Sequence, residues 1–273
     1  SSLVLVVLDS CRWDTFARAL DGGGVPHLAR FGPPERRYSY ASWTAPSHYN
    51  LLMGLLPHRS PTGVFASEVY KEEYVRYAAR LGAEVAFKDL LPSLWLPAFL
   101  RAGLGYENHA LVSLPVLNPA TPLNRDFDSY RLMDKHNDME AIVAAMRWSE
   151  DRPSFHLLNV GETHYPYVGR GEDPGPLPHL AGLHGVARSL AEGVGVQQEQ
   201  APAFFDGDAL ARLHDRQVDT LRGLDRALEA LFDRVPAGTS IVITADHGEL
   251  FGEGGFFGHG PILHDKVLEV PFV

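Results

Sequence analysis

The residues best suited to chemistry lie in three short segments. Asp9 closes an apolar run from Leu3 to Leu8, and Asp246-His247-Gly248-Glu249 follows a second apolar run from Ser240 to Thr244. Between them, Thr44-Ala45-Pro46-Ser47-His48 carries a hydroxyl where a hydrolase would place its nucleophile. Carboxylates, an imidazole and a hydroxyl together could bind a metal ion and attack an ester.

The elements around these segments would bring them together. Both apolar runs are typical of buried strands, and ligands of open α/β sheets bind outside the carboxyl ends of strands. We therefore expect Asp9 and Asp246-His247 to share one crevice, which Thr44 completes. Pro46 fits the first turn of a helix, so that Thr44 would lie at the positive end of the helix dipole, where an alkoxide and a phosphoryl group are favoured.

The three segments, in this order, resemble the motifs of the alkaline phosphatase and sulfatase superfamily. The resemblance extends from Leu3 to Pro271, although the middle third of the chain matches weakly. The residues that carry it are Asp9-Ser10-Cys11-Arg12-Trp13-Asp14, then Thr44-Ala45-Pro46-Ser47 with Leu51-Leu52 and Gly54, and finally Asp246-His247-Gly248-Glu249 with Gly258-His259-Gly260.

The resemblance implies an alkaline phosphatase-like fold. This is an α/β three-layer sandwich with a mostly parallel central sheet flanked by helices, and residues 1–273 would form a single catalytic domain. Sulfatases continue into a smaller C-terminal sheet domain after a segment like Leu268-Glu269-Val270-Pro271. Only Phe272 and Val273 follow here, so we expect most of that subdomain to be missing.

The resemblance also implies roles for individual residues. Asp9, Thr44, Asp246 and His247 would bind the metal, Thr44 would also be the nucleophile, and His164, His259 and Arg12 would complete the catalytic set. Simpler interpretations stay open: Asp9 could cap a helix, Arg12 could pair with Asp14, and either histidine could be a solvated loop residue. Three oxygens and one imidazole favour Zn²⁺ or Mn²⁺ over Ca²⁺ or Mg²⁺. His164 and His259 could contribute to a second metal site, but no third ligand is evident.

Thr44 separates this chain from the sulfatases, which convert Cys or Ser to formylglycine. A threonine alkoxide can instead attack phosphorus and form a phosphothreonine. The sequence therefore predicts a metal-dependent hydrolase of phosphate mono- or diesters, or of phosphonate esters. The alternatives are a phosphoryl or phosphoethanolamine-type transferase, a sulfatase, and an inactive metal-binding scaffold. The specific substrate is not predicted.

Composition limits the remaining possibilities. The chain has 273 residues, of which 45% are hydrophobic and 21% charged, and its net charge is −10. Nucleic-acid and anionic-membrane surfaces are usually basic, so we expect neither of those partners. The expected partner is the small anionic ester that the resemblance implies. No apolar run reaches the ~18 residues of a membrane-spanning helix, and we expect a soluble, cytoplasmic protein. Cys11 is the only cysteine, which excludes a disulfide within the chain.

Strand and helix patterns alternate along the chain, which independently predicts a mostly parallel sheet covered by helices. The segments rich in Gly and Pro are expected to be excursions from the core. We expect one at residues 57–77, and a lid or substrate loop at 165–207. Expected helices are 12–20, 94–102, 139–148 and 208–234, and further expected strands are 110–113 and 155–160.

Overall fold

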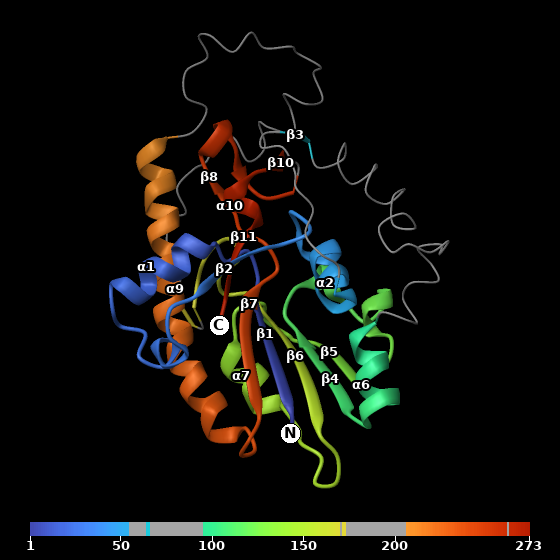
Figure 1. Ribbon diagram of the computed structural model, residues 1–273. Helices are drawn as coiled ribbons and strands as arrows, with labels where there is room; N and C mark the ends of the chain where they lie inside the picture. The colour runs from blue at the N-terminus through green and yellow to red at the C-terminus, as the bar shows by residue number, and fades with distance from the viewer. Residues whose placement is uncertain (55–63, 66–94, 170, 173–205, 261) are drawn as a thin grey trace.

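A seven-stranded sheet forms the centre of the molecule. The computed structural model describes residues 1–54, 64–65, 95–169, 171–172, 206–260 and 262–273, and within these the strand order is β2-β11-β7-β1-β6-β4-β5 (Figure 1). Four of the strand pairs are parallel, and only β11 runs antiparallel to its neighbours β2 and β7. The strands are β1 (Leu3–Leu8), β2 (Glu35–Tyr38), β4 (Glu107–Val112), β5 (Ser129–Leu132), β6 (Ser154–Val160), β7 (Ser240–Ala245) and β11 (Glu269–Phe272).

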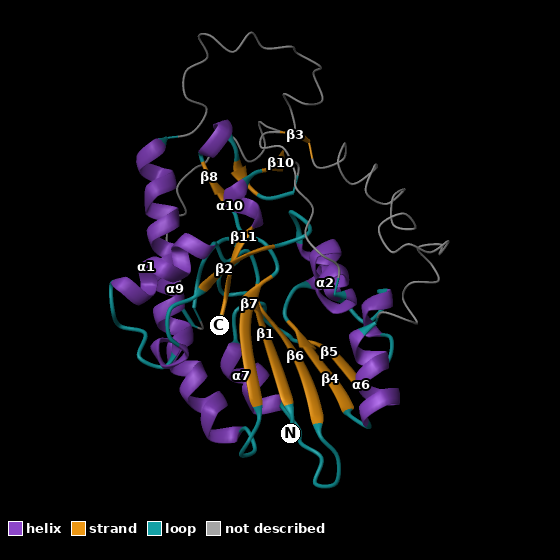
Figure 2. Cartoon of the chain, viewed as in Figure 1, coloured by secondary structure: helices purple, strands orange, loops and turns teal. Residues whose placement is uncertain are grey.

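Helices cover both faces of this sheet, which gives the three layers that the sequence predicts (Figure 2). Val4, Val6 and Leu8 of β1 enter the core beneath α1, α7 and α9, whereas Leu5 and Val7 enter the core beneath α2 and α6. This division follows from the strand itself, because successive side chains point to opposite faces. The helices are α1 (Trp13–Asp21), α2 (Thr44–Met53), α6 (Leu96–Leu104), α7 (Met139–Ala145) and α9 (Gly207–Arg234).

The predicted elements are confirmed with small changes of boundary. The helix expected at 139–148 ends at Ala145, and the strand expected at 110–113 is β4, which begins at Glu107. The long helix expected at 208–234 is α9, and its leucine stripe is buried, as expected. Leu210 and Leu213 pack in a cluster with Tyr167, and the other leucines pack in the core beside the sheet. The stripe consists of Leu210, Leu213, Leu221, Leu224, Leu228 and Leu231.

Strands β2, β5 and β11 were not predicted from the sequence. All four residues of β2 are exposed, and β5 alternates between exposed and half-buried positions. Edge strands of this kind have no continuous apolar run, because they form by backbone pairing with one neighbouring strand. The pattern that identifies central strands therefore fails at both edges of the sheet.

Smaller elements lie outside the central sheet. Strand β3 (Val64–Phe65) pairs with β10 (Ile262–Leu263), and β8 (Leu250–Phe251) pairs with β9 (Phe257–Gly258). A short helix, α10 (Asp265–Leu268), precedes β11. Four 3-10 turns complete the described elements: η1 (Leu28–Phe31), η2 (Pro115–Leu117), η3 (Pro122–Asn124) and η4 (Glu253–Gly255).

Two sequence-based expectations fall largely outside the described residues. The excursion at 57–77 is described only at 64–65, and the predicted lid at 165–207 is described only at its two ends. The lid therefore stays a prediction. Among the described helices, none combines the length and the apolar character that crossing a bilayer requires, and the cytoplasmic location also stays a prediction.

A buried carboxyl group holds the start of α7. Glu162 is 3% exposed, and its Oε1 accepts a hydrogen bond of 2.7 Å from the backbone N–H of Met139. Its Oε2 has no hydrogen-bond partner among the described residues. Burial raises the pKa of Glu162 to about 7, against the weaker opposing effect of the Met139 hydrogen bond. The folded protein therefore favours the protonated form of this group.

Replacing this carboxyl group should change how stability depends on pH. The pKa of Glu162 is higher in the folded protein than in the unfolded chain. Its contribution to stability is therefore fully present below the unfolded pKa and is lost as the pH rises through about 7. Relative to Glu162→Gln, which keeps the acceptor for Met139, we expect the free energy of unfolding of the wild type to fall by about 2 to 3 kcal/mol between pH 5 and pH 8. Urea denaturation of both proteins at several pH values measures this difference.

The control is Glu150→Gln, which removes an exposed carboxylate beyond the same helix. Its stability should follow the wild type at every pH. Parallel pH curves for the wild type and Glu162→Gln would contradict a raised pKa at Glu162.

Candidate active site and metal centre

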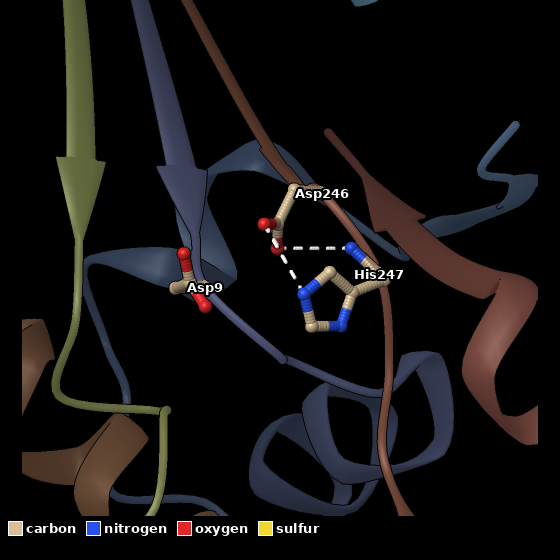
Figure 3. A group of neighbouring side chains, drawn as sticks. All are labelled: Asp9, Asp246 and His247. Carbon is tan, nitrogen blue, oxygen red and sulfur yellow. Dashed lines mark hydrogen bonds and ion pairs between the residues drawn. The ribbon is translucent and has the colours of Figure 1, made fainter. Parts of the chain in front are cut away.

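The candidate site lies where β1 and β7 end, beside the first turn of α2 (Figure 1). The two strands are parallel neighbours, with Leu8 opposite Ala245, so that the next residues, Asp9 and Asp246, emerge side by side. Figure 3 shows both carboxylates together with the imidazole of His247. Helix α2 begins at Thr44, so the hydroxyl stands at the amino end of a helix, as predicted.

The four predicted metal ligands converge. Asp9, Asp246 and His247 each offer one ligand atom, and these atoms lie within 4.8 Å of one another. Thr44 Oγ1 lies 3.5 Å from Asp9 Oδ1 and 3.4 Å from His247 Nε2. All four residues are at most 5% exposed. Their donor set of two carboxylates, one hydroxyl and one imidazole suits a divalent transition metal such as Zn²⁺ or Mn²⁺.

Electrostatics support the same interpretation. Burial and the negative charge of Asp9 hold the pKa of Asp246 well above its usual value. Burial also acts to raise the pKa of Asp9, but the nearby His247, His164 and His48 lower it overall. Among the described residues, Asp246 Oδ2 has no hydrogen-bond partner. Two adjacent buried carboxylates repel each other, and a bound cation would relieve this repulsion.

His247 is held in the form that a metal ligand requires. Its Nδ1 lies 2.8 Å from the carbonyl oxygen of Gly248. A carbonyl can only accept, so the proton belongs on Nδ1, and the lone pair of Nε2 faces Thr44 and Asp246. Burial, reinforced by the neighbouring His259, lowers the pKa of His247 well below its usual value. The imidazole is therefore neutral at pH 7.

A glycine is required after this histidine. A Cβ on Gly248 would lie 2.2 Å from the carbonyl oxygen of Lys266, so any side chain there would collide with backbone. The Gly248 N–H donates to the carbonyl of Val267 over 2.6 Å. Close backbone packing thus explains the Asp-His-Gly sequence in physical terms.

One oxygen of Asp246 has a structural role, because it accepts hydrogen bonds from two backbone turns. Oδ1 accepts hydrogen bonds from the backbone N–H groups of Ser10, at 3.1 Å, and His247, at 2.9 Å. Ser10 has a φ of 61°, an uncommon conformation for a residue with a side chain. The carboxylate therefore ties the turn after β1 to the turn after β7 and keeps Oδ2 available to a metal.

Asn159 is a site residue that the sequence analysis missed. Its Nδ2 donates to Asp9 Oδ2 over 2.9 Å, and its Oδ1 accepts from the backbone N–H groups of Ser113 and Leu114. It is fully buried near the end of β6. The side chain therefore fixes the orientation of the Asp9 carboxylate. The available signal was a single amide within the otherwise apolar segment Leu157–Val160.

His259 is oriented by a second buried acid. Its Nδ1 lies 2.8 Å from Glu249 Oε1, while Glu249 Oε2 accepts a hydrogen bond of 2.5 Å from the hydroxyl of Tyr167. Burial acts to lower the pKa of His259, but the hydrogen bond and charge of Glu249 outweigh it, so the pKa lies above its usual value. This arrangement leaves Nε2 of His259 free for a substrate. The sequence analysis gave no role to Glu249 or Tyr167.

The two predicted histidines lie together beside the candidate metal ligands. The ring centroid of His259 is 4.3 Å from that of His247 and 5.4 Å from that of His164. His164 Nδ1 lies 2.8 Å from the carbonyl oxygen of Tyr165, which leaves Nε2 free. Both rings are half-buried. In the part of the chain described, the only cluster of three potential metal ligands is Asp9, Asp246 and His247, so the second metal site stays a prediction.

Arg12 lies among carboxylates rather than at the open side of the site. It donates to both oxygens of Asp14, at 2.7 and 2.6 Å, and to Glu253 Oε1 at 2.7 Å. It also donates to the carbonyl of Glu249 and lies over the ring of Phe251, and it is 3% exposed. The pairing with Asp14 that was the alternative interpretation is therefore present. The catalytic role of Arg12 stays a prediction.

Comparison with known proteins identifies the fold. No family model and no curated protein sequence matches the chain. Among solved structures, it is similar to phosphonate monoester hydrolase SpPMH from Silicibacter pomeroyi, with a TM-score of 0.55 and 16% identity, covering 100% of this chain and 67% of that one. The soluble domain of lipooligosaccharide phosphoethanolamine transferase A from Neisseria meningitidis gives a TM-score of 0.54 and 13% identity, covering 99% and 74%.

A third similar structure contains a metal. It is the C-terminal periplasmic domain of EcEptC from Escherichia coli in complex with Zn, with a TM-score of 0.51 and 12% identity, covering 99% of this chain and 71% of that one. At these identities the likeness concerns the fold. The chain has the alkaline phosphatase-like fold, and the resemblance seen in its motifs is confirmed at that level.

The metal site can be tested without measuring activity. In Asp246→Asn the amide oxygen can still accept from Ser10 and His247, whereas the negative charge at Oδ2 is lost. We expect the fold to survive and the affinity for Zn²⁺ to fall roughly a hundredfold or more. Excess Zn²⁺ should raise the melting temperature of the wild type, because a ligand that binds the folded state stabilises it, and should barely change that of the variant.

Asp215→Asn is the matched control, since Asp215 is an exposed acid that pairs with Arg18 on the surface. It should bind Zn²⁺ like the wild type. Equal metal content in Asp246→Asn and the wild type, measured by elemental analysis after dialysis, would refute the assignment of Asp246 as a ligand.

Proposed function

We propose that this chain is a metal-dependent hydrolase of phosphate mono- or diesters, or of phosphonate esters, that acts through a phosphorylated Thr44. The observation that carries the proposal is the position of Thr44 Oγ1, within 3.5 Å of both Asp9 and His247 and at the start of helix α2. Asp9, Asp246 and His247 would hold the cation. When bound, a divalent cation would lower the pKa of the Thr44 hydroxyl and neutralise charge on a phosphoryl oxygen.

The surrounding residues suit a two-step reaction. In the first step, Thr44 Oγ1 loses its proton to solvent and bonds to phosphorus, while the bond from phosphorus to the leaving oxygen breaks. His259, which Glu249 orients through Nδ1, would give the leaving oxygen a proton from Nε2. In the second step, a water molecule gives a proton to His259 and its oxygen bonds to phosphorus. The threonine–phosphorus bond breaks, and the Thr44 oxygen takes up a proton from solvent.

His164 would position the phosphoryl group. Its Nδ1 is engaged by the carbonyl of Tyr165, and its ring lies edge-on to that of His259. A protonated Nε2 on either ring could therefore donate to an anionic oxygen of the substrate. The amino end of α2 adds backbone N–H groups and a positive dipole on the Thr44 side.

A transferase is the second candidate, supported by the similarity to lipooligosaccharide phosphoethanolamine transferase A. In that case an alcohol rather than water would accept the group from Thr44. Product analysis separates the two reactions: with p-nitrophenyl phosphate and added ethanolamine or glycerol, a hydrolase releases mainly inorganic phosphate, whereas a transferase forms the phosphorylated alcohol. A sulfatase is disfavoured because the side chain of Thr44 carries a methyl group and cannot yield the formylglycine aldehyde.

Thr44 variants should separate the roles of hydroxyl and methyl group. We expect Thr44→Ala to reduce kcat by at least about a thousandfold, because the nucleophile is lost, and Thr44→Ser to retain part of the activity. The panel should include p-nitrophenyl phosphate, bis-p-nitrophenyl phosphate, a p-nitrophenyl phosphonate and p-nitrophenyl sulfate. After an acid quench, mass spectrometry of the Thr44 peptide should detect a phosphoryl or phosphonyl adduct.

Thr239→Ala is the matched control, because Thr239 lies before β7, at the opposite end of that strand from Asp246. It should keep full activity. Normal turnover by Thr44→Ala would refute the nucleophile. Zn²⁺ binding without turnover of any ester in the panel would instead favour the inactive scaffold.

A further inference from the structure

A second cavity lies at the other end of the sheet from the metal centre. It has a volume of about 460 Å³, within the usual range for small-molecule sites. Its centre is a row of three polar side chains on neighbouring strands: Ser129 of β5, His109 of β4 and His156 of β6, which lie opposite one another in register. His156 precedes Val160 by four residues, roughly 13 Å along the strand. The cavity is therefore separate from the residues around Asp9.

These polar residues interrupt an apolar face of the sheet. Leu111 and Leu158 follow the two histidines on the same face and belong to the core beneath α7. Helix α7 ends at Ala145, so it reaches the cavity only with its last turn and with the buried Met146. The cavity thus combines apolar walls with a small polar floor.

The imidazole of His156 presents a buried hydrogen-bond acceptor. Its Nε2 lies 2.9 Å from the carbonyl of Arg147, so Nε2 carries the proton and Nδ1 keeps a lone pair. This residue is 0% exposed, and Nδ1 has no hydrogen-bond partner among the described residues. Burial, together with the nearby His109, lowers the pKa of His156 to about 4. At pH 7 the ring is therefore a neutral acceptor.

The imidazole of His109 also has one ring nitrogen without a hydrogen-bond partner among the described residues. His109 Nδ1 lies 2.8 Å from Ser129 Oγ, whereas Nε2 has no hydrogen-bond partner in the described part of the chain. The nearest carboxylate oxygen, Glu107 Oε1, is 3.6 Å away, and Glu107 is itself paired with Arg152. The two histidine rings lie 4.9 Å apart between centroids, with their planes inclined by 31°, so they pack against each other as a pair.

An aromatic ring packs against the histidine pair, and two cations line the cavity. Trp148 packs against His156 with ring centroids 4.3 Å apart. Arg131 of β5 and Arg147, just after α7, line the cavity and are exposed. Neither guanidinium has an ion-pair partner among the described residues, and no acidic residue lines the cavity. Unpaired guanidinium groups are well suited to bind phosphate or carboxylate.

We propose that this cavity binds a planar heteroaromatic anion about the size of a mononucleotide. Its ring would lie against the histidine pair, an N–H or O–H group of the ring would donate to His156 Nδ1, and its phosphate or carboxylate would bind Arg131 and Arg147. A metal ion fits less well, because these residues form no cluster of three ligands; within the described residues the one such cluster is at Asp9. The site is distinct from the proposed catalytic centre and does not depend on its function.

The test uses calorimetric titration of the metal-free full chain carrying Thr44→Ala, so that no probe is turned over. The probes are AMP and UMP, which carry a phosphate, indole-3-acetate, which carries a carboxylate, and inorganic phosphate alone. At least one ring-bearing probe should bind, and phosphate alone should bind far more weakly. Adding Arg131→Gln and Arg147→Gln together should weaken that binding at least about tenfold. Both positions are exposed, so the fold should be retained.

Two further measurements locate the binding. Nitrogen NMR of the histidine rings should show the Nδ1 signal of His156, assigned with His156→Gln, moving when the probe binds. Esterase activity of a protein with intact Thr44 should be unchanged by the two arginine substitutions. The proposal would be overturned if no ring-bearing probe bound with a Kd below about 5 mM. Binding that the arginine substitutions leave unchanged would also overturn it.

Discussion

The repulsion between two buried carboxylates determines the organisation of the site. Parallel pairing of β1 with β7 puts Asp9 and Asp246 side by side at the ends of two apolar strands. Burial raises the pKa of Asp246 well above its usual value, an effect that the charge of Asp9 strengthens. Such a pair is costly without a cation between the acids. The neighbouring residues hold both carboxylates in place despite this cost.

That support comes mainly from hydrogen-bond donors of the backbone and of polar side chains. The backbone N–H of Ser10 holds one oxygen of Asp246, and Asn159 holds one oxygen of Asp9. The hydroxyl of Thr163 donates to the carbonyl of Asp9 at 2.7 Å, and Gln217 of α9 donates to the carbonyls of Ser10 and Thr163. Helix α9 thus reaches the turns on which the site is built. Among the described residues, Oδ2 of Asp246 therefore accepts no hydrogen bond, and Oδ1 of Asp9 accepts only from the hydroxyls of Ser10 and Thr44.

The sequence predicted what depends on local patterns. Continuous apolar runs identified the central strands, leucine spacing identified α9, and the acids after two strands indicated the cluster of Asp9, Asp246 and His247 that could bind a metal. It missed Asn159 and Glu249, because their roles depend on partners far away in the chain: Asn159 lies 150 residues from Asp9 in the sequence. The sequence also left the role of Arg12 open, because a guanidinium can bind either a substrate anion or a neighbouring acid. The structure pairs it with Asp14 and Glu253.

The same sheet has different chemistry at its two ends. At the carboxyl ends of the strands, buried acids favour the binding of a cation. Near the amino ends of β4 and β6, neutral histidines favour a hydrogen-bond donor, and two unpaired arginines favour an anion. On the face of β6 that carries His156, the residues toward the site are Leu158 and Val160, which are apolar and fully buried. Substitutions at one end should therefore be energetically additive with substitutions at the other, because separated sites without shared partners rarely couple.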